Sequence, residues 1–272
     1  KMKFNFKIQK YQTDAIDAVI KAFAGQGFHD HTRFIRDLGE MSAKDKQMQL
    51  GFTDNNIEVY DPSDDTGYKN ELVEISDEQL LHNIQEIQRQ NNIKRSASLV
   101  KDLGRCSLDI EMETGTGKTY VYIKTMFELN KNYGWSKFIV VVPSIAIREG
   151  VKKSFEITVD HFMEHYGKKA RFFVYDSSSL NQLDNFSSNA GINVMIINTQ
   201  AFAASLKEGG RSKESRVIYS KRDEFGSRRP IDIIAANRPI IILDEPQKMG
   251  GDVTQKALKN FHPLFTLNYS AT

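Results

Sequence analysis

A glycine-rich run between an apolar segment and a helical pattern constrains this chain more than any other feature. The run Glu111–Thr119 reads EMETGTGKT, follows the short apolar segment 106–110 and precedes helical spacing over residues 120–129. A strand that turns through glycines into a helix can direct successive backbone N–H groups toward one bound phosphate. The sequence therefore predicts a phosphate-binding loop for a nucleotide.

The side chains of this loop have separate predicted roles. Lys118 is expected to reach the outer phosphates, and the Thr119 hydroxyl is expected to bind Mg²⁺. Met112 stands where the complete form of this pattern has glycine, so the match departs from the pattern at that residue. The expected cofactor-binding residues of the loop are Thr114, Gly115, Thr116, Gly117, Lys118 and Thr119.

A second segment carries the acidic groups that such a loop requires. The apolar run 239–243 ends in Asp244 and Glu245, which is typical of a buried parallel strand with carboxylates at its carboxyl end. Ligands of open α/β sheets bind at that edge. We expect Asp244 to hold Mg²⁺ through a bridging water and Glu245 to orient or deprotonate an attacking water. Lys118, Asp244 and Glu245 are the candidate catalytic residues.

The order of predicted elements indicates an α/β fold. Strand-like runs at 106–110, 137–142, 171–175, 194–198, 239–243 and 265–269 alternate with segments of helical character, including 120–129 and 146–157. Repeated strand–helix units predict a mostly parallel, doubly wound sheet. We divide the chain into a helical region at 1–27, an insertion at 28–105 and a nucleotide-binding core at 106–272.

The residues before the core are expected to form smaller elements. Helical spacing predicts a helix over Lys10–Phe23, which the glycines at 25 and 27 then end. Inside the insertion, residues 58–74 are predicted to form a surface hairpin that turns at 61–67. Residues 77–90 are predicted to form a helix with Ser76 as its N-terminal cap.

A polar stretch from Leu206 to Arg238 interrupts the alternation and is rich in charged residues. Long loops inside compact domains are usually functional or disordered. Two interpretations remain open for this basic loop: a solvated, mobile insertion or a surface that contacts DNA phosphates.

Composition sets wider limits. There are 37 basic residues against 35 acidic residues, and the formal charge of +2 neither requires nor excludes nucleic acid binding. The single Cys106 excludes an internal disulfide framework and fits a reducing compartment. Because no apolar run approaches membrane-spanning length and no signal peptide is recognisable, we expect a cytoplasmic protein with no membrane partner.

Together these segments resemble the motifs of superfamily 2 helicases. The glycine loop, the acidic strand end, the run Val141–Gly150 (VVPSIAIREG) and the terminal Ser-Ala-Thr resemble helicase motifs I, II, Ia and III. The residues of these motifs most closely resemble the restriction (Res) subunit of type III restriction–modification enzymes, and the resemblance extends over most of the chain. Pro246 and Gln247 replace the Ala-Asp of DEAD-box RNA helicases, which therefore fit less well.

This resemblance implies a RecA-like P-loop NTPase domain that hydrolyses ATP with Mg²⁺ and acts as a DNA motor with a helicase-like ATPase activity. It assigns adenine reading to Gln12, for which a polar position on an amphipathic helix is the alternative interpretation. Ser270 and Thr272 are expected to couple nucleotide state to DNA binding. The implied DNA-binding residues are Pro143, Ser144, Ile147 and Thr199.

The resemblance also implies partners and further domains. The partners are double-stranded DNA and a modification (Mod) methyltransferase subunit, which would recognise the DNA sequence. A second RecA-like domain with an arginine finger and a nuclease are expected beyond Thr272, so the fragment alone is expected to bind ATP weakly and hydrolyse it slowly. The alternatives are another superfamily 2 helicase or translocase, and a non-catalytic, ATP-dependent DNA-binding module.

One other pattern has a different meaning if taken by itself. His161 to His165 matches the His-x-x-Glu-His spacing of zinc peptidases, and the i, i+4 spacing places both imidazoles on one helix face. We favour a nucleotide motor over a zinc enzyme, because the motor already accounts for the rest of the chain.

Overall fold

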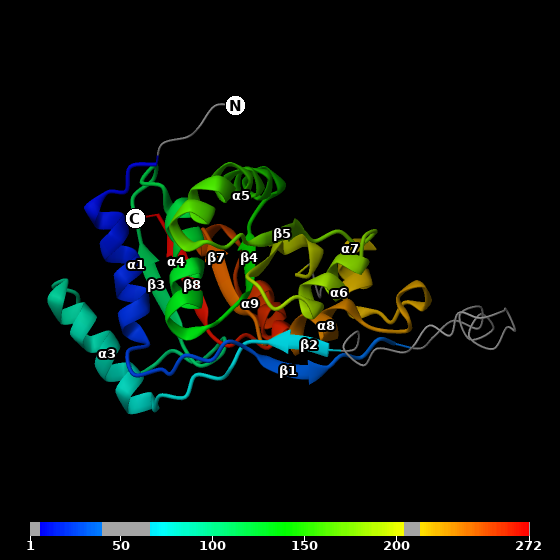
Figure 1. Ribbon diagram of the computed structural model, residues 1–272, viewed down its shortest axis with the longest axis horizontal. Helices are drawn as coiled ribbons and strands as arrows, with labels where there is room; N and C mark the ends of the chain where they lie inside the picture. The colour runs from blue at the N-terminus through cyan, green and yellow to red at the C-terminus, as the bar shows by residue number, and fades with distance from the viewer. Residues whose placement is uncertain (1–5, 40–65, 204–212, 272) are drawn as a thin grey trace, which may run out of the picture.

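A parallel sheet of six strands, in the order β3-β8-β7-β4-β6-β5, forms the centre of the computed structural model (Figure 1). The structure describes residues 6–39, 66–203 and 213–271. In chain order, the strands of the sheet are β3 (Ser107–Glu111), β4 (Lys137–Val142), β5 (Arg171–Val174), β6 (Asn193–Asn198), β7 (Ile240–Asp244) and β8 (Thr266–Ser270).

The interior strands are buried on both faces. Every residue of β4, β6 and β7 is buried. Continuous apolar runs such as 138–142 and 240–243 supply side chains to both faces at once, which is the pattern of parallel strands covered by helices. Along β4, Phe138 and Val140 pack into one hydrophobic cluster, while Ile139 and Val141 pack into the other.

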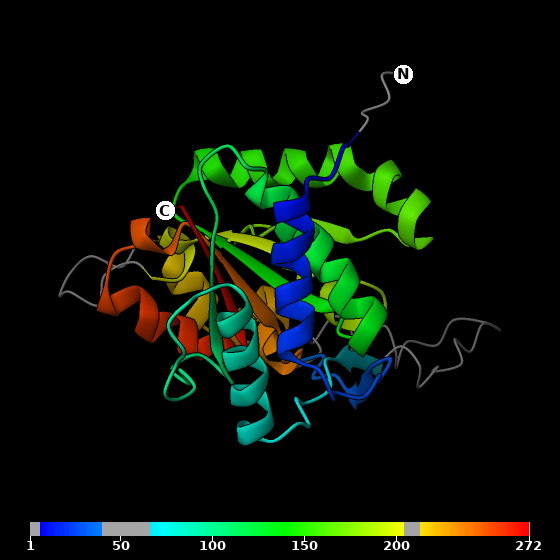
Figure 2. The same ribbon diagram turned by 90° about the vertical axis from the view of Figure 1, so that its left-hand side faces the viewer.

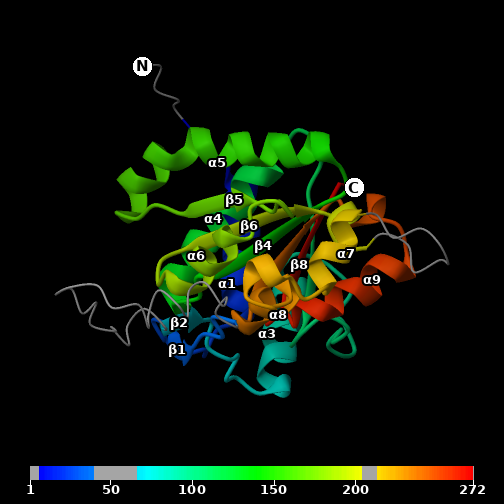
Figure 3. The same ribbon diagram turned by 90° about the vertical axis from the view of Figure 1, so that its right-hand side faces the viewer.

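Helices cover both faces of the sheet. Figure 2 shows α1 and α3 on one side, and Figure 3 shows α7, α8 and α9 on the opposite side. The first side consists of α1 (Lys10–Ala22), α3 (Asp77–Gln90), α4 (Lys118–Tyr133) and α5 (Ile145–Tyr166). The second side consists of α6 (Asn181–Ser188), α7 (Lys213–Tyr219), α8 (Pro230–Ala236) and α9 (Asp252–Leu258), with the 3₁₀ turn η5 (Lys259–Phe261).

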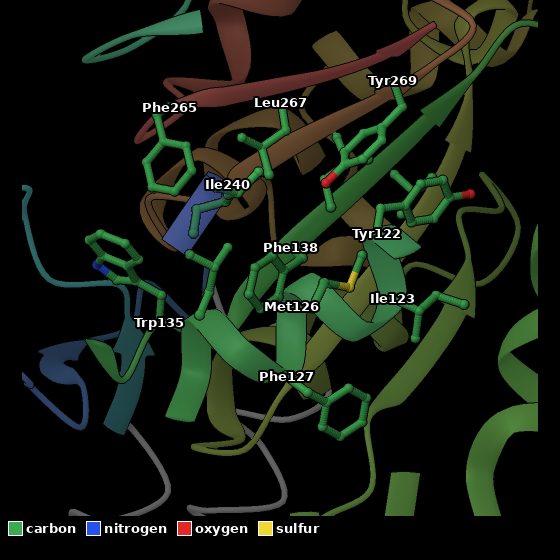
Figure 4. Close-up of a cluster of buried hydrophobic side chains, with 14 of the residues drawn as sticks. Tyr122, Ile123, Met126, Phe127, Trp135, Phe138, Ile240, Phe265, Leu267 and Tyr269 are labelled. Atoms are coloured by element: carbon green, nitrogen blue, oxygen red, sulfur yellow. The ribbon is translucent and has the colours of Figure 1, made fainter. Parts of the chain in front are cut away.

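The larger core lies between α4 and the sheet, and aromatic side chains dominate it (Figure 4). Trp135 contacts Phe265 with ring centroids 5.2 Å apart, and Tyr122 contacts Tyr269 at 5.4 Å, in each case edge to face. Such pairs add about 0.5–1.5 kcal/mol to the stabilisation from burial. The helix that begins at the glycine loop is therefore firmly packed against β8.

The predicted α/β architecture is confirmed. Each of the six predicted strand segments contains a strand of the parallel sheet, with bounds that agree within a residue or two. The helix after the loop begins earlier than predicted, at Lys118, and α5 extends further, to Tyr166. Ser76 caps α3 as predicted, because its hydroxyl accepts a hydrogen bond from the Gln79 N–H at 3.2 Å.

The predicted hairpin turn is wrong where the structure describes it. Thr66 and Gly67 belong to strand β2 (Thr66–Lys69), which pairs antiparallel with β1 (Thr32–Ile35). The turn-forming residues around Asp61-Pro62 favoured a local turn, but the partner of β2 comes from much earlier in the chain. Residues 58–65 of the predicted hairpin lie outside the described residues.

The stretch 206–238 is not one long loop. Its described part contains α7, the 3₁₀ turn η3 (Asp223–Phe225) and α8. These elements cover the second face of the sheet because apolar residues are spaced among the charges, and Ile218 and Ile234 are fully buried. The many charged residues of this stretch concealed the spacing of its apolar residues in the sequence. Residues 204–212 lie outside the described part of the chain.

Asn70 fastens the small β1–β2 sheet to the core. Its side-chain amide is buried and donates to the backbone oxygens of Lys137 (2.9 Å) and Arg238 (3.0 Å). Its side-chain oxygen accepts from the N–H groups of Ser136 (2.8 Å) and Lys137 (3.0 Å). All four hydrogen-bonding positions of the amide are used, so one side chain joins β2 to the start of β4 and the end of α8.

Lys137 is a buried lysine at the first position of β4. Its ammonium donates to the backbone oxygens of Phe186 and Asn189 at the end of α6, and lies 5.3 Å from the Phe186 ring centroid. Burial lowers the pKa of Lys137 to about 7. A cation near a helix C-terminus is favourable, but here the cost of desolvation outweighs that gain.

We expect Asn70→Ala to lower the free energy of unfolding by about 3 kcal/mol, because several buried backbone groups lose their partners. Urea unfolding of the purified chain measures this change. Asn132→Ala is the matched control, since Asn132 is exposed on α4, and a surface substitution is expected to cost less than about 0.5 kcal/mol. Equal effects of the two substitutions would contradict the role given to Asn70.

Lys137 predicts a pH dependence of stability. The unfolded chain keeps this lysine protonated up to about pH 10.4, whereas the folded chain releases the proton near pH 7. Above pH 7 the unfolded state binds more protons, so stability rises with pH by up to about 1.4 kcal/mol per unit. Urea unfolding at pH 7.5 to 8.5 should show this rise in the native chain and a flatter dependence in Lys137→Met.

The difference in stability between the native chain and Lys137→Met excludes the effect of a second titrating group, Cys106. Burial raises the pKa of the Cys106 thiol to about 12, and this group lowers stability as pH rises above the pKa of an unfolded thiol. Both proteins retain Cys106, so its effect cancels in the difference. Parallel stability curves for the two proteins would show that Lys137 does not titrate in this range.

Candidate functional site

The carboxyl ends of three adjacent strands meet at one edge of the sheet. Strand β8 lies between β3 and β7, with Glu111 paired to Ser270 and Asp244 paired to Tyr269. Hydrogen bonds from Met112 N to Ser270 O (3.0 Å) and from Glu245 N to Tyr269 O (2.9 Å) extend the pairing past the strand ends. The glycine loop and the two acids are thereby placed at the same edge, as the sequence predicts.

The glycine loop turns directly into α4. Gly115 and Gly117 have φ angles of 80° and 76°, in the left-handed region that favours glycine. An ideal Cβ on Gly117 would lie 2.6 Å from Nε2 of Gln12. Gly117 is therefore required for the backbone turn, and a side chain at this position would displace the Gln12 amide.

Gln12 is tied to the loop rather than exposed on its helix. Its side-chain amide donates to the backbone oxygen of Thr116 at 2.8 Å, and its side-chain oxygen accepts from Gln9 N at 2.9 Å. The Tyr11 hydroxyl donates to the same Thr116 oxygen at 3.3 Å. A primary amide has two N–H groups and two acceptor positions, so one of each is left in Gln12 for a ligand.

Lys118, Asp244 and Glu245 come together although they are distant in the sequence. The Lys118 ammonium is hydrogen-bonded to Oε1 of Glu245 and lies 3.5 Å from Oδ1 of Asp244. The side chains of Lys118 and Glu245 are each 14% exposed, and that of Asp244 is 5% exposed. One cation facing two carboxylates leaves this largely buried cluster with an excess of negative charge.

The two acids differ in their electrostatic surroundings. Burial raises the pKa of Asp244, and the nearby Lys118 only partly opposes that effect. Burial also acts to raise the pKa of Glu245, but hydrogen bonding and attraction from Lys118, with a hydrogen bond from Gln247, hold the pKa of Glu245 below its usual value. Two neighbouring carboxylates in different environments can take different chemical roles.

The backbone of Glu245 is strained. Its φ and ψ angles are 58° and 56°, a left-handed conformation that costs a non-glycine residue of the order of 1 kcal/mol or more. The strain is maintained by the Glu245 N–H bond to β8 and by the turn η4 (Pro246–Lys248), where Lys248 N donates to Glu245 O at 2.9 Å. Gln247 also donates to Oε2 of Glu245. This conformation aims the carboxylate at Lys118.

Tyr122 is a member of this cluster that the sequence did not reveal. Its ring is fully buried, and its hydroxyl donates to Oδ2 of Asp244 at 3.0 Å. Burial raises the pKa of Tyr122, and the Thr119 side chain acts in the opposite direction. Tyr122 follows Lys118 by four residues on α4, so helical spacing places both on one face. That spacing was the available signal, but an apolar core position is the usual meaning of a tyrosine there.

The oxygen-bearing residues at this edge fit a magnesium ion. Mg²⁺ prefers oxygen ligands and usually binds proteins through one or two side chains, with phosphates and waters completing the shell. Asp244 is a buried carboxylate that accepts a hydrogen bond from Tyr122, and Thr119 precedes Tyr122 by three residues on the same helix. No group of three or more His, Cys, Asp or Glu residues suited to a metal occurs within the described residues, so phosphate oxygens would have to supply most of the other ligands.

Segments predicted to contact DNA follow the next two strands of the sheet. Strand β4 pairs with both β7 and β6. Pro143 and Ser144, which follow β4, therefore lie next to the acids that end β7, and Thr199, which follows β6, lies one strand further away. Ser144 caps α5, because its hydroxyl accepts from Ile147 N at 3.3 Å. Thr199 is mostly buried at the start of the 3₁₀ turn η2 (Thr199–Ala201).

Polar side chains join these two segments. Gln200 donates to the backbone oxygen of Pro143 at 3.2 Å, and Asn198 donates to the Gln200 side-chain oxygen at 2.9 Å. Arg148 of α5 donates to Oδ1 of Asn198 at 3.1 Å. Beyond them, a cavity of about 550 Å³ is lined by residues that include Arg148, Lys152 and Asp176. Polar and charged groups of both signs therefore lie on this half of the edge.

One of the two predicted coupling residues is described by the structure. Ser270 ends β8 between the loop and the acids, whereas Thr272 lies outside the described residues.

The two histidines of the His-x-x-Glu-His pattern lie on α5 and have local partners. Nε2 of His161 pairs with the Tyr120 hydroxyl at 2.7 Å, and Nδ1 of His165 pairs with the backbone oxygen of His161 at 2.8 Å.

No helix of the described residues has the length and apolar character needed to cross a bilayer.

Comparisons with known proteins agree with this architecture. The family described as "Type III restriction enzyme, res subunit" matches residues 5–272. The chain is 31% identical over 226 residues to the Res subunit of the type III restriction–modification enzyme EcoP15I of Escherichia coli. It is 29% identical over 225 residues to the EcoPI Res subunit of Escherichia phage P1.

The alignments cover 75% of this chain but 22% of each of these two relatives. A third relative, the StyLTI Res subunit of Salmonella typhimurium, is 31% identical over 62% of the chain. The chain thus spans about a fifth of the length of its relatives. The match to nearly the whole chain, together with the parallel sheet and the glycine loop that joins β3 to α4, establishes that the chain belongs to the Res subunit family of type III restriction enzymes, as a helicase-like P-loop domain.

Proposed function

We propose that this chain is the ATP-binding and ATP-hydrolysing domain of a DNA motor in a type III restriction enzyme. The observation that supports the proposal most strongly is the meeting of Lys118 with Asp244 and Glu245 at the carboxyl edge of the sheet. Family membership supports the same role, and fold alone would not, because P-loop folds host many functions.

The loop residues would bind the triphosphate of ATP. Residues Gly115 to Thr119 span the end of the loop and the start of α4, and the N–H groups and dipole of a helix N-terminus favour anions. Lys118 would exchange its carboxylate partners for phosphate oxygens. The excess negative charge that this exchange leaves on Asp244 and Glu245 favours a cation beside them.

Asp244 and Thr119 are the proposed Mg²⁺-binding residues. When bound, Mg²⁺ neutralises phosphate charge that develops during in-line attack. Glu245 would accept a proton from the attacking water or orient that water. Its constrained backbone fixes the position of its carboxylate.

The rest of the machinery is proposed to lie in the parts of the full-length protein that this chain does not cover. Phosphoryl transfer in such motors also needs an arginine from a second motor domain, so we expect slow turnover from this chain alone. DNA cleavage would be performed by a separate nuclease, and sequence recognition by a Mod methyltransferase partner.

Double-stranded DNA is the proposed substrate of the motor. Pro143, Ser144 and Ile147 would contact its backbone at the N-terminus of α5, with Thr199 beside them after β6. The Asn198–Gln200 connection would keep these two segments at a fixed spacing. Ser270 ends the strand between the loop and the acids, and we propose that it helps to couple nucleotide state to DNA binding.

Glu245→Gln tests the proposed base. Measured in the full-length Res subunit with its partner, this variant should lose at least about a hundredfold in ATP turnover, the usual contribution of a general base. The isolated chain should still bind ATP, because the glutamine retains the shape of the side chain. Glu156→Gln, an exposed position on α5, is the matched control. Unchanged turnover in Glu245→Gln would remove Glu245 from the mechanism.

Gln12→Ala tests the adenine assignment. Loss of the bonds to Thr116 and to the base should weaken ATP binding about tenfold, since each neutral hydrogen bond contributes about 1 kcal/mol. Calorimetric titration with ATP and GTP should show the larger loss for ATP. Gln90→Ala, exposed at the end of α3, is the control. Equal losses for the two nucleotides would mean that Gln12 supports the loop without reading the base.

A further inference from the structure

The Tyr122 hydroxyl contacts one of the residues proposed to hold magnesium. It donates to Oδ2 of Asp244 at 3.0 Å. The ring of Tyr122 is fully buried and packs edge to face on Tyr269, with centroids 5.4 Å apart (Figure 4). The core therefore fixes the ring, while the hydroxyl reaches the acidic residue at the end of β7.

The two oxygens of Asp244 have different neighbours. Oδ1 lies 3.5 Å from the Lys118 ammonium, and Oδ2 accepts from Tyr122. If Lys118 moves to phosphate oxygens, Oδ1 loses its cation while Oδ2 keeps its donor. The carboxylate then stays in one orientation, with Oδ1 open toward the site.

A simpler explanation is that any buried tyrosine requires a hydrogen-bond partner. Tyr269 shows what that explanation predicts, because it is equally buried and, among the described residues, its hydroxyl is hydrogen-bonded to the Thr125 side chain, at 3.5 Å. Tyr122 differs because it donates to the proposed magnesium-binding carboxylate of Asp244. Groups that hydrogen-bond to metal-binding carboxylates fix their orientation, and their removal typically costs 10- to 100-fold in metal affinity.

We propose that Tyr122 is a positioning residue that orients the Asp244 carboxylate for magnesium bound with ATP. The inference rests on the proposed function, and it assigns Tyr122 no contact with the nucleotide. Tyr122 acts through a hydroxyl that is presented by the first turns of α4, so the helix that carries Lys118 also fixes the acid of β7.

Tyr122→Phe removes this hydroxyl and leaves the ring. The test is calorimetric titration of the chain with a non-hydrolysable ATP analogue, in excess Mg²⁺ and in chelator. In Tyr122→Phe, the factor by which Mg²⁺ tightens nucleotide binding should fall about tenfold. Affinity in chelator should stay within about twofold of the native chain, because the loop and Lys118 are unchanged.

Tyr269→Phe is the matched control, since it removes an equally buried hydroxyl that has no contact with Asp244. It should keep the Mg²⁺ effect within about twofold. If Tyr122→Phe does not fold, as circular dichroism would show, 4-aminophenylalanine and 4-fluorophenylalanine at position 122 provide the same comparison. The amino group donates and should preserve the Mg²⁺ effect, whereas the fluorine cannot donate and should lose it.

The outcomes separate this inference from the proposed function. A native chain that binds no nucleotide, or binds it without a Mg²⁺ effect, would overturn both. A native Mg²⁺ effect that persists in Tyr122→Phe would overturn the inference alone. So would an equal loss of affinity with and without Mg²⁺, because that result is expected when tyrosine only supports packing.

Discussion

The position of β8 between β3 and β7 is the constraint on which the candidate site depends. Parallel pairing brings all carboxyl ends to one edge, and this strand order makes the glycine loop, Ser270 and Asp244 neighbours across that edge. Lys118 can then reach Glu245 although 127 residues separate them in the chain. The buried aromatic contact between Tyr122 and Tyr269 links α4 to β8, so the core also fixes the distance from the loop to the acids.

Three polar side chains form hydrogen bonds that join distant segments of the chain. Asn70 joins the insertion to β4, Gln12 joins α1 to the loop, and Tyr122 joins α4 to β7. A buried polar group without a partner is costly, so each pair specifies how two segments must fit together. The carboxyl edge of the sheet has two parts. The proposed nucleotide-site residues follow β3, β8 and β7, and the proposed DNA-binding residues follow β4 and β6.

The sequence predicted the sheet well because parallel strands buried on both faces are continuous apolar runs, visible without any contact information. It failed at Thr66 and Gly67, where turn-forming residues nearby suggested a local hairpin and the true partner, β1, lay far away in the chain. It also failed in the stretch before Arg238, where charged residues concealed the spacing of buried isoleucines on α7 and α8.

The sequence by itself determined the phosphate-binding loop and the acidic strand end, because both depend on short runs whose local geometry follows from residue type. Only the tertiary structure decided which groups surround them. The Gln12 amide lies next to Gly117, the Tyr122 hydroxyl is hydrogen-bonded to Asp244, and β8 holds the left-handed backbone of Glu245. These contacts join residues from different elements, and their distances follow from helix packing and strand order, which no local pattern records.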